Sequence, residues 1–347
     1  STVPTSGLYL ALEDNVADAN VLEMNVVNPV PSFHAGRIAL SGGAILTGWP
    51  TNGPGIWLGT TSGDFNTASN WQAGIVPSAG DSIFIDDGAS QSLTITSPTT
   101  IGAITIVGAT LALQDSLIVT GTASLGGGTL ACSGNGAVRV SYPGADSVAF
   151  SANGSACNVY VTDGRVYLDQ TTNLSSVFVQ QDAILDLNGQ TLTAAGDLVL
   201  TETSRLVMTE SSDTVRVGSQ ARFQGGDETG LLTAGALIVS GSFLQGGATT
   251  AFASSGTLHV FLGDSTSVGP TQYTIDFNEA ATSPINRLTI FDNRLAQKAV
   301  NVAGELRLAD GAALTGLATT AQGGFRLEGL SSSISVDRLA VAGQLYI

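Results

Sequence analysis

Short apolar runs recur along residues 80–347 at intervals of about 20 to 30 residues, with no helix-length pattern between them. Residues 184–200 show the unit. Apolar and polar residues alternate from Ile184 to Thr193, a turn at Asn188-Gly189 interrupts them, and alternation resumes at Leu198. A helix-free repeat of this size is typical of a β-solenoid, in which each turn buries its inward side chains by stacking on its neighbours. We therefore predict an all-β chain built as a solenoid.

The glycine-marked corners give a count of the expected turns. Successive turns are expected to start near Ile83, Ile104, Leu130, Val159, Ile184, Leu206, Leu237, Leu258, Leu288, Val302 and Phe325. About ten turns, each rising about 4.8 Å, would make a solenoid about 50 Å long. Residues 263–287 contain Pro270 and Pro284 and interrupt the rhythm, so they are expected to form an irregular turn or a protruding loop.

The charge of the chain excludes some classes of partner. The net charge is −16, and Lys298 is the only lysine among 347 residues. We expect no nucleic-acid partner, because phosphate binding needs clustered Lys and Arg, and the same argument disfavours an anionic membrane surface. With 43 glycines and only 12% charged residues, the composition is similar to that of secreted bacterial surface proteins.

The start of the chain and its hydropathy bear on location. No run of about 18 apolar residues occurs, so no membrane-spanning helix is expected. The first residues, 1–4, show no leader pattern and fit either a processed mature start or a truncated one. The expected location is extracellular, at the cell surface.

Two cysteines, Cys132 and Cys157, are separated by about one turn. In stacked turns their Cα atoms would lie about 4.8 Å apart, near the lower end of disulfide geometry. They are expected to form a disulfide between turns in an oxidising compartment, with two buried thiols as the alternative.

The chain divides into two regions by pattern. Residues 1–57 contain strand-like runs at Leu8–Leu12 and Val21–Val27, prolines at 29 and 31, and a glycine- and proline-rich stretch before Trp57. We expect this region to be a separate β element that acts as a cap, an interaction arm or a small domain. The solenoid is expected to occupy residues 58–347.

The most specific local motif lies in residues 57–85. It consists of Trp57, the pair Asn70-Trp71, then Gly74, Pro77 and Gly80-Asp81, followed by a strand-like run. This pattern resembles the opening motif of many bacterial surface β-solenoids, including passenger regions of autotransporter type. The runs at residues 104–113 and 185–193 are similar to repeats of the same proteins.

The resemblance implies a right-handed parallel β-solenoid displayed outside the cell. In such a protein, Trp57 and Trp71 would cover the first turn, while Asn70 and Asp81 would bond exposed backbone groups at corners. Pro77 and Gly80 complete the motif. Ligand stacking on the tryptophans is the alternative to this capping role. The chain shows no C-terminal membrane barrel or anchoring segment, so the resemblance extends to the surface solenoid and not to the autotransporter route.

The last residues form an apolar strand-like run without a polar cap. Leu345, Tyr346 and Ile347 would expose unpaired backbone groups and apolar side chains unless something covers them. Head-to-tail contact with a second copy would cover them, and the run Leu8, Tyr9 and Leu10 could donate the complementary strand.

Candidate chemistry is sparse. The acidic clusters are Asp86-Asp87, Asp227-Glu228 and Glu210 with Asp213, all at expected corners, where such residues form turns by default. Calcium binding is the alternative, and no cofactor is expected. The two histidines, His34 and His259, are far apart and accompany no cysteine cluster, so no zinc site is expected.

These patterns favour a structural protein over an enzyme. The expected function is a self-assembling subunit of a bacterial surface fibre whose partners are copies of itself. The first alternative is an adhesin stalk that binds a glycan. The second is a polysaccharide lyase or hydrolase on a β-helix scaffold.

Overall fold

The computed structural model describes residues 55–144, 146–154, 156–247, 250–263, 271–277, 285–329 and 331–347. The chain divides into two compact units, Ser1–Gly53 and Pro54–Ile347, and the described residues belong to the second. That unit begins slightly before the expected boundary at residue 58, because Gly55 and Ile56 already pair with the first full turn. The expected β element at residues 1–57 lies almost wholly outside the described residues.

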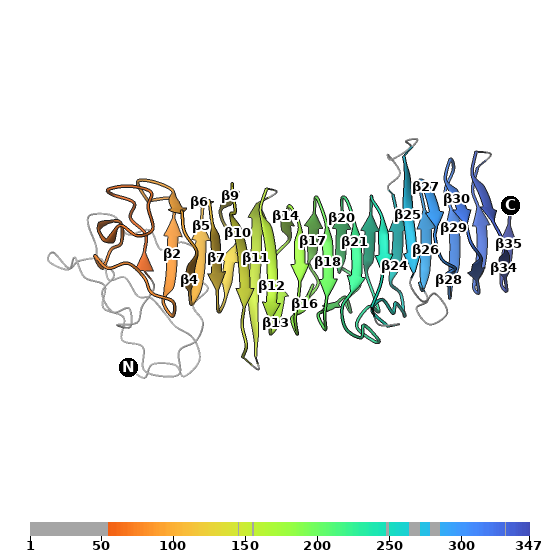
Figure 1. Ribbon diagram of the computed structural model, residues 1–347, viewed down its shortest axis with the longest axis horizontal. Helices are drawn as coiled ribbons and strands as arrows, with labels where there is room; N and C mark the ends of the chain where they lie inside the picture. Colours follow the sequence, from red (N-terminus) through yellow and green to blue (C-terminus); the bar gives the residue numbers. More distant parts are fainter. Residues whose placement is uncertain are drawn as a thin grey trace, which may run out of the picture. The chain divides into compact units, whose positions relative to one another are not determined.

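In its described residues, the second unit is all-β apart from one short 3-10 helix, η1 (Ala68–Asn70). Its long strand ladders are parallel, and its turns stack one after another from β2 to β35 (Figure 1). The predicted parallel β-solenoid is thereby confirmed. Each full turn presents up to three strands, and strands in equivalent positions of successive turns form three faces, which we call the first, second and third face.

The first face begins each turn. Its strands are β1 (Gly55–Ile56), β2 (Ser82–Asp86), β5 (Ala103–Val107), β8 (Ala123–Leu125), β11 (Ser147–Gly154), β13 (Arg165–Leu168), β16 (Ile184–Asp186) and β19 (Arg205–Val207), then β28 (Val300–Val302), β31 (Thr319–Ala321) and β34 (Leu339–Val341). Between β19 and β28, isolated bridges at Leu232, Ser254 and Ile285 replace strands.

The second face follows after the first corner. Its strands are β3 (Leu93–Ile95), β6 (Thr110–Leu113), β9 (Thr129–Cys132), β14 (Thr172–Leu174), β17 (Thr191–Ala194), β20 (Thr214–Val217), β22 (Ala236–Val239), β24 (His259–Leu262), β26 (Arg287–Ile290), β29 (Glu305–Leu308), β32 (Gly324–Leu327) and β35 (Gln344–Tyr346). The long strand β11 crosses from the first face to the second, since its end at Asn153 and Gly154 pairs with β14.

The third face is one sheet of 12 strands, one from each turn. They are β4 (Thr99–Ile101), β7 (Ser116–Val119), β10 (Ala137–Ser141), β12 (Asn158–Asp163), β15 (Val177–Val179), β18 (Leu198–Thr201), β21 (Ala221–Gln224), β23 (Phe243–Gln245), β25 (Gln272–Phe277), β27 (Asn293–Ala296), β30 (Ala313–Gly316) and β33 (Ser333–Val336). The expected count of about ten turns was therefore too low.

The expected turn starts were also out of phase. Ile83 and Ile184 lie on the first face as expected, but Leu237 lies on the second face and Val159 on the third. The alternation of apolar and polar residues identifies which residues point inward, but it does not identify the face on which each of them lies. The expected irregularity at residues 263–287 is also partly wrong, because β25 pairs with both β23 and β27 in the long sheet.

The core is a set of inward ladders that run along the solenoid. On the third face, one inward position is occupied in successive turns by the buried residues Leu117, Val138, Val159, Val177, Leu198, Ala221, Phe243 and Ile275. Each contacts the residue above and below it, which is the packing that β-branched and aliphatic side chains favour on a pleated surface. Leu187 is fully buried, as the alternating pattern predicts.

Corners need residues that allow sharp bends and close stacking. The predicted turn at Asn188-Gly189 is present, and both residues have positive φ, 49° and 79°. At Gly164, φ is 68° and an added Cβ would lie 1.7 Å from the carbonyl oxygen of Tyr142 in the preceding turn. A side chain at Gly164 would thus prevent the two turns from approaching.

Candidate functional site

The N-terminal motif forms an aromatic cluster in front of the first full turn. Trp57 and Trp71 are almost fully buried, with ring centroids 5.0 Å apart, and Phe65 packs edge-on against Trp71 at 5.2 Å. The indole of Trp57 donates to the carbonyl of Gln91 at 2.7 Å, and that of Trp71 donates to the carbonyl of Phe65 at 2.8 Å. Their faces and their polar atoms are thus used inside the protein, as in a cap and not in an open stacking platform.

Asn70 organises the loop around this cluster. It is fully buried, and its Oδ1 accepts the backbone N–H groups of Thr61 and Ser62 at 2.9 and 3.0 Å. Its Nδ2 donates to the Ser62 hydroxyl and to the Asp64 carbonyl, both at 3.0 Å. The Asn70 side chain therefore provides hydrogen-bond partners for backbone groups of this irregular loop that are not paired in a strand ladder.

The remaining motif residues shape the following corner. Asp81 accepts from both the N–H and the hydroxyl of Ser78 at 2.7 and 2.8 Å, and these bonds hold the pKa of Asp81 below its usual value. Gly80 stacks beneath Gly102, where an added Cβ would lie 2.4 Å from the Gly80 carbonyl. Pro77 packs against Gly55. All these contacts are intramolecular and local.

Cys132 and Cys157 form a disulfide with Cα atoms 5.1 Å apart. Cys132 ends β9, and Cys157 is fully buried just before β12. The disulfide therefore joins two consecutive turns. It lies near β11, the strand that crosses from the first face to the second.

The last turn presents apolar side chains to solvent. Leu345 follows Phe325 at the same inward position of the second face, yet Phe325 is 2% exposed and Leu345 is 55% exposed. Tyr346 is 48% and Ile347 90% exposed. The proposed complementary residues Leu8, Tyr9 and Leu10 lie outside the described residues.

Glu228 is a buried carboxyl group that sequence reasoning assigned to a turn. Its Oε1 accepts a hydrogen bond from the backbone N–H of Leu206 in β19 at 2.9 Å. The turn after β19 has no strand on the first face, so this bond takes the place of a ladder bond there. The buried Oε2 of Glu228 has no hydrogen-bond partner. Burial raises the pKa of Glu228 to about 8, with the neighbouring Asp227 adding slightly and Arg205 opposing. The group is therefore mainly protonated at neutral pH.

Arg294 is a buried base in the third face. Its guanidinium binds Asp292 through two nitrogens, at 2.5 and 2.7 Å, and donates to backbone carbonyls of residues 239–241. Burial lowers the pKa of Arg294, and the Asp292 carboxylate opposes that shift. Because β27 pairs with β25 and β25 with β23, the side chain reaches across an intervening turn to the corner before β23.

His259 is half-buried on the second face, where its Nε2 lies 2.8 Å from the Thr289 hydroxyl and its ring stacks on Phe261. Burial, together with Arg287 and Arg307, lowers the pKa of His259 to about 4, so the ring is neutral at physiological pH. His34 lies outside the described residues. Within the described ranges, no group of three or more His, Cys, Asp or Glu side chains is placed to hold a metal ion.

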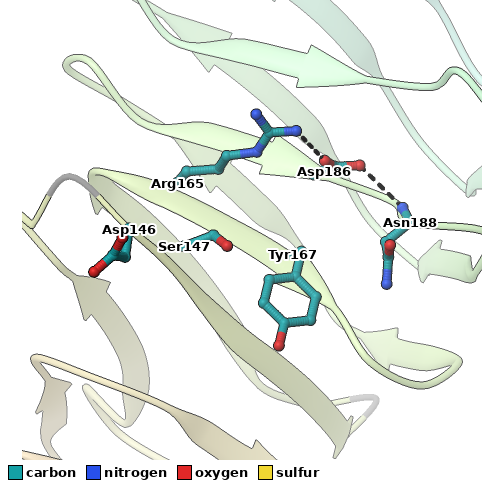
Figure 2. Close-up of a pocket in the computed structure, with 6 residues that line it drawn as sticks. All are labelled: Asp146, Ser147, Arg165, Tyr167, Asp186 and Asn188. Atoms are coloured by element: carbon teal, nitrogen blue, oxygen red, sulfur yellow. Dashed lines mark hydrogen bonds and ion pairs between the residues drawn. The ribbon is translucent and has the colours of Figure 1, made fainter.

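The first face carries a hollow of about 570 Å³ between β11, β13 and β16. It is lined by Asp146, Ser147, Arg165, Tyr167, Asp186 and Asn188 (Figure 2). Arg165 donates to Asp186 at 2.5 Å, and the other oxygen of Asp186 accepts the backbone N–H of Asn188 at 3.0 Å. Adjacent strands bring these residues together, since Ser147 pairs with Arg165 and Tyr167 pairs with Asp186. Sequence reasoning missed this hollow, because it requires the register between turns.

Comparison with family models, with curated proteins and with solved structures finds no match to this chain. Across the part of the chain that the structure describes, none of the helices has the length and apolar character needed to cross a membrane.

Proposed function

We propose that the chain is an extracellular structural protein, a solenoid subunit that associates with copies of itself into a bacterial surface fibre. The observation that carries the proposal is the stack of parallel turns, in which each inward residue is buried by contact with the turns before and after it. The same parallel pairing that joins one turn to the next within the chain can also join a turn of one copy to a turn of another.

The internal chemistry of the solenoid supports a structural role. The tryptophans, Asn70 and Asp81 of the N-terminal motif all bond within the chain, and the buried pair Arg294–Asp292 ties one turn to another. The disulfide between Cys132 and Cys157 fits an oxidising compartment, where such bonds persist. Together these features favour a stable element outside the cell.

Charge supports head-to-tail contact. Residues 285–347 contain six basic and five acidic residues, whereas residues 1–284 contain six basic and 23 acidic residues. A contact between the C-terminal turns of one copy and the acidic remainder of another would bring unlike charge densities together, while side-by-side contact of the acidic parts would be repulsive.

The test is electron microscopy of the purified chain at neutral pH, with Leu345→Asp and Leu317→Asp as paired variants. Leu317 is also exposed, at 42%, but lies at the corner between β30 and β31, one turn before the last strands. We expect ordered filaments from the parent and from Leu317→Asp, and dispersed short particles from Leu345→Asp. Dispersed parent protein, or filaments that persist in Leu345→Asp, would refute the proposal.

A further inference from the structure

The two outward tyrosines Tyr160 and Tyr167 lie on neighbouring turns in different surroundings. On the third face, the ring of Tyr160 has Arg139 above it at 4.2 Å and Phe178 stacked on it at 4.8 Å, so both of its faces are occupied. On the first face, Tyr167 has Ala149 and Asp186 as its ladder neighbours. Among the described residues, no aromatic ring or guanidinium stacks on Tyr167, and its ring lines the hollow.

The small residues of β11 create the open space beside this ring. Ser147 and Ala149 stand opposite Arg165 and Tyr167 in the ladder, so two long side chains of β13 face two short ones of β11. Figure 2 shows the Tyr167 ring with Asp146 and Ser147 on one side and Asn188 on the other. An apolar ring surface is therefore bordered by groups that form hydrogen bonds.

The polar groups around the ring are held in place. Asp186 is fixed by Arg165 and by the N–H of Asn188, and the Asn188 amide donates to the Leu168 carbonyl at 3.1 Å. The Arg165 side chain remains 51% exposed while it bonds Asp186 through one nitrogen. Planar carboxylate and guanidinium groups match pairs of adjacent donors and acceptors on a ligand, and rigid strands keep them oriented.

The charge of the hollow selects the ligand class. Two carboxylates face one guanidinium, which is already paired, so an anionic ligand would meet net negative charge. The described residues provide no cluster of three or more metal-ligating side chains there. A neutral ligand with one apolar face and several hydroxyl groups fits both the ring and its border.

We propose that the hollow between β11, β13 and β16 binds a neutral pyranose of a glycan chain, with Tyr167 as the stacking surface and Asp146, Arg165, Asp186 and Asn188 as hydrogen-bonding groups. The hollow lies open on a sheet face, and Asp146, Ser147, Arg165 and Asn188 at its border are exposed. Such a site suits one segment of a longer chain whose remaining sugars extend across the surface. This activity is additional to self-assembly and independent of the last turn.

The test is isothermal titration calorimetry with short, neutral glucan, mannan, galactan and chitin oligosaccharides, and with a polyuronate oligosaccharide. We expect at least one neutral oligosaccharide to bind and the polyuronate not to bind. Tyr167→Ala should weaken that binding by about fivefold or more, since an aromatic contact of this kind contributes on the order of 1 kcal/mol. Tyr167→Phe should retain it.

The matched control is Tyr160→Ala, which removes a tyrosine from the third face and should leave glycan affinity unchanged. A second variant, Ser147→Trp, adds bulk at an exposed position and should block the hollow even if Tyr167→Ala folds poorly. No binding by any neutral oligosaccharide would overturn the proposal. Equal loss in Tyr160→Ala and Tyr167→Ala, or binding of the polyuronate alone, would overturn it as well.

Discussion

At the scale of single residues, two of the buried ionisable groups in the described part of the solenoid, Arg294 and Glu228, are accommodated in different ways. Arg294 is bonded by a carboxylate and by backbone carbonyls, and these bonds offset the desolvation of its charge. Glu228 has one bond, from Leu206, and an oxygen without a partner, so burial keeps it protonated. Of these two groups, Glu228 therefore couples the fold to pH near neutrality.

Glu228 predicts a loss of stability as pH rises. The folded pKa of Glu228, about 8, exceeds the ordinary glutamate value of 4.5. The contribution of Glu228 to the free energy of unfolding is therefore complete below pH 4.5 and is lost as pH rises through about 8. Within that window the free energy of unfolding should fall by up to about 1.4 kcal/mol per pH unit. Denaturant melts of Glu228→Gln at a series of pH values should show this slope removed.

The neighbouring exposed residue supplies the control. Asp227→Asn removes a carboxylate whose pKa is lowered by hydrogen bonds to Thr229, so this group does not titrate near neutral pH. The variant should therefore show the same dependence of the free energy of unfolding on pH as the parent, between slightly acidic and slightly alkaline pH. If Glu228→Gln shows the same slope as the parent, the carboxyl group of Glu228 is not the origin of the dependence.

At the scale of elements, alternation predicted which residues face inward, and the motif predicted the buried tryptophans. The turn at Asn188-Gly189 could be read from its residue types, because few residues tolerate positive φ. The phase of the turns could not be read, since Val159 and Leu206 are equally inward but lie on different faces. The hollow could not be predicted for the same reason, because the proximity of Arg165 and Asp186 follows from the register between β13 and β16, which the sequence pattern does not give.

The N-terminal loop should depend on Asn70. In Asn70→Ala, the N–H groups of Thr61 and Ser62 lose their acceptor, and each hydrogen bond of this kind contributes about 0.5 to 1.5 kcal/mol. Hydrogen exchange of residues 57–71 should therefore accelerate strongly. Asn66→Ala, at an exposed position of the same loop, should leave it nearly unchanged. Equal exchange in both variants would show that Asn70 does not organise the cap.

The disulfide should stabilise the turns around β11. Closing a loop across a separation of 25 residues is worth about 3 kcal/mol in the chain-entropy account. The double variant Cys132→Ser with Cys157→Ser should lower the melting temperature measured by circular dichroism without loss of strand signal. Reduction of the parent should give the same shift, and an unchanged melting temperature under reduction would contradict this expectation.

At the scale of the whole solenoid unit, each turn contacts mainly the turns before and after it. The free energy of unfolding is then a sum of contributions from the individual turns and from the interfaces between neighbouring turns. Two distant turns are coupled only through the turns that lie between them. A defect in the middle can uncouple the two sides, whereas a defect on the surface cannot.

Leu187→Asp tests this coupling. Leu187 is fully buried, and an unpaired charge there should cost several kcal/mol, about 3 or more. We expect the single melting transition of the parent to split into two, because the turns on either side of β16 lose their common interface. Thr193→Asp, at an outward position of the next strand, should melt like the parent. A parent-like melt of Leu187→Asp would contradict the inward assignment.

The parallel pairing of each strand with the strand one turn earlier also determines how the chain can acquire its structure. Ile104 pairs with Ile83, and Val138 pairs with Leu117, so the strands of each turn pair with residues about one turn earlier in the chain. Loops of this length close quickly and at modest entropic cost. A chain that becomes free to fold from one end can therefore complete one turn at a time, and each completed turn provides the strands on which the next one pairs.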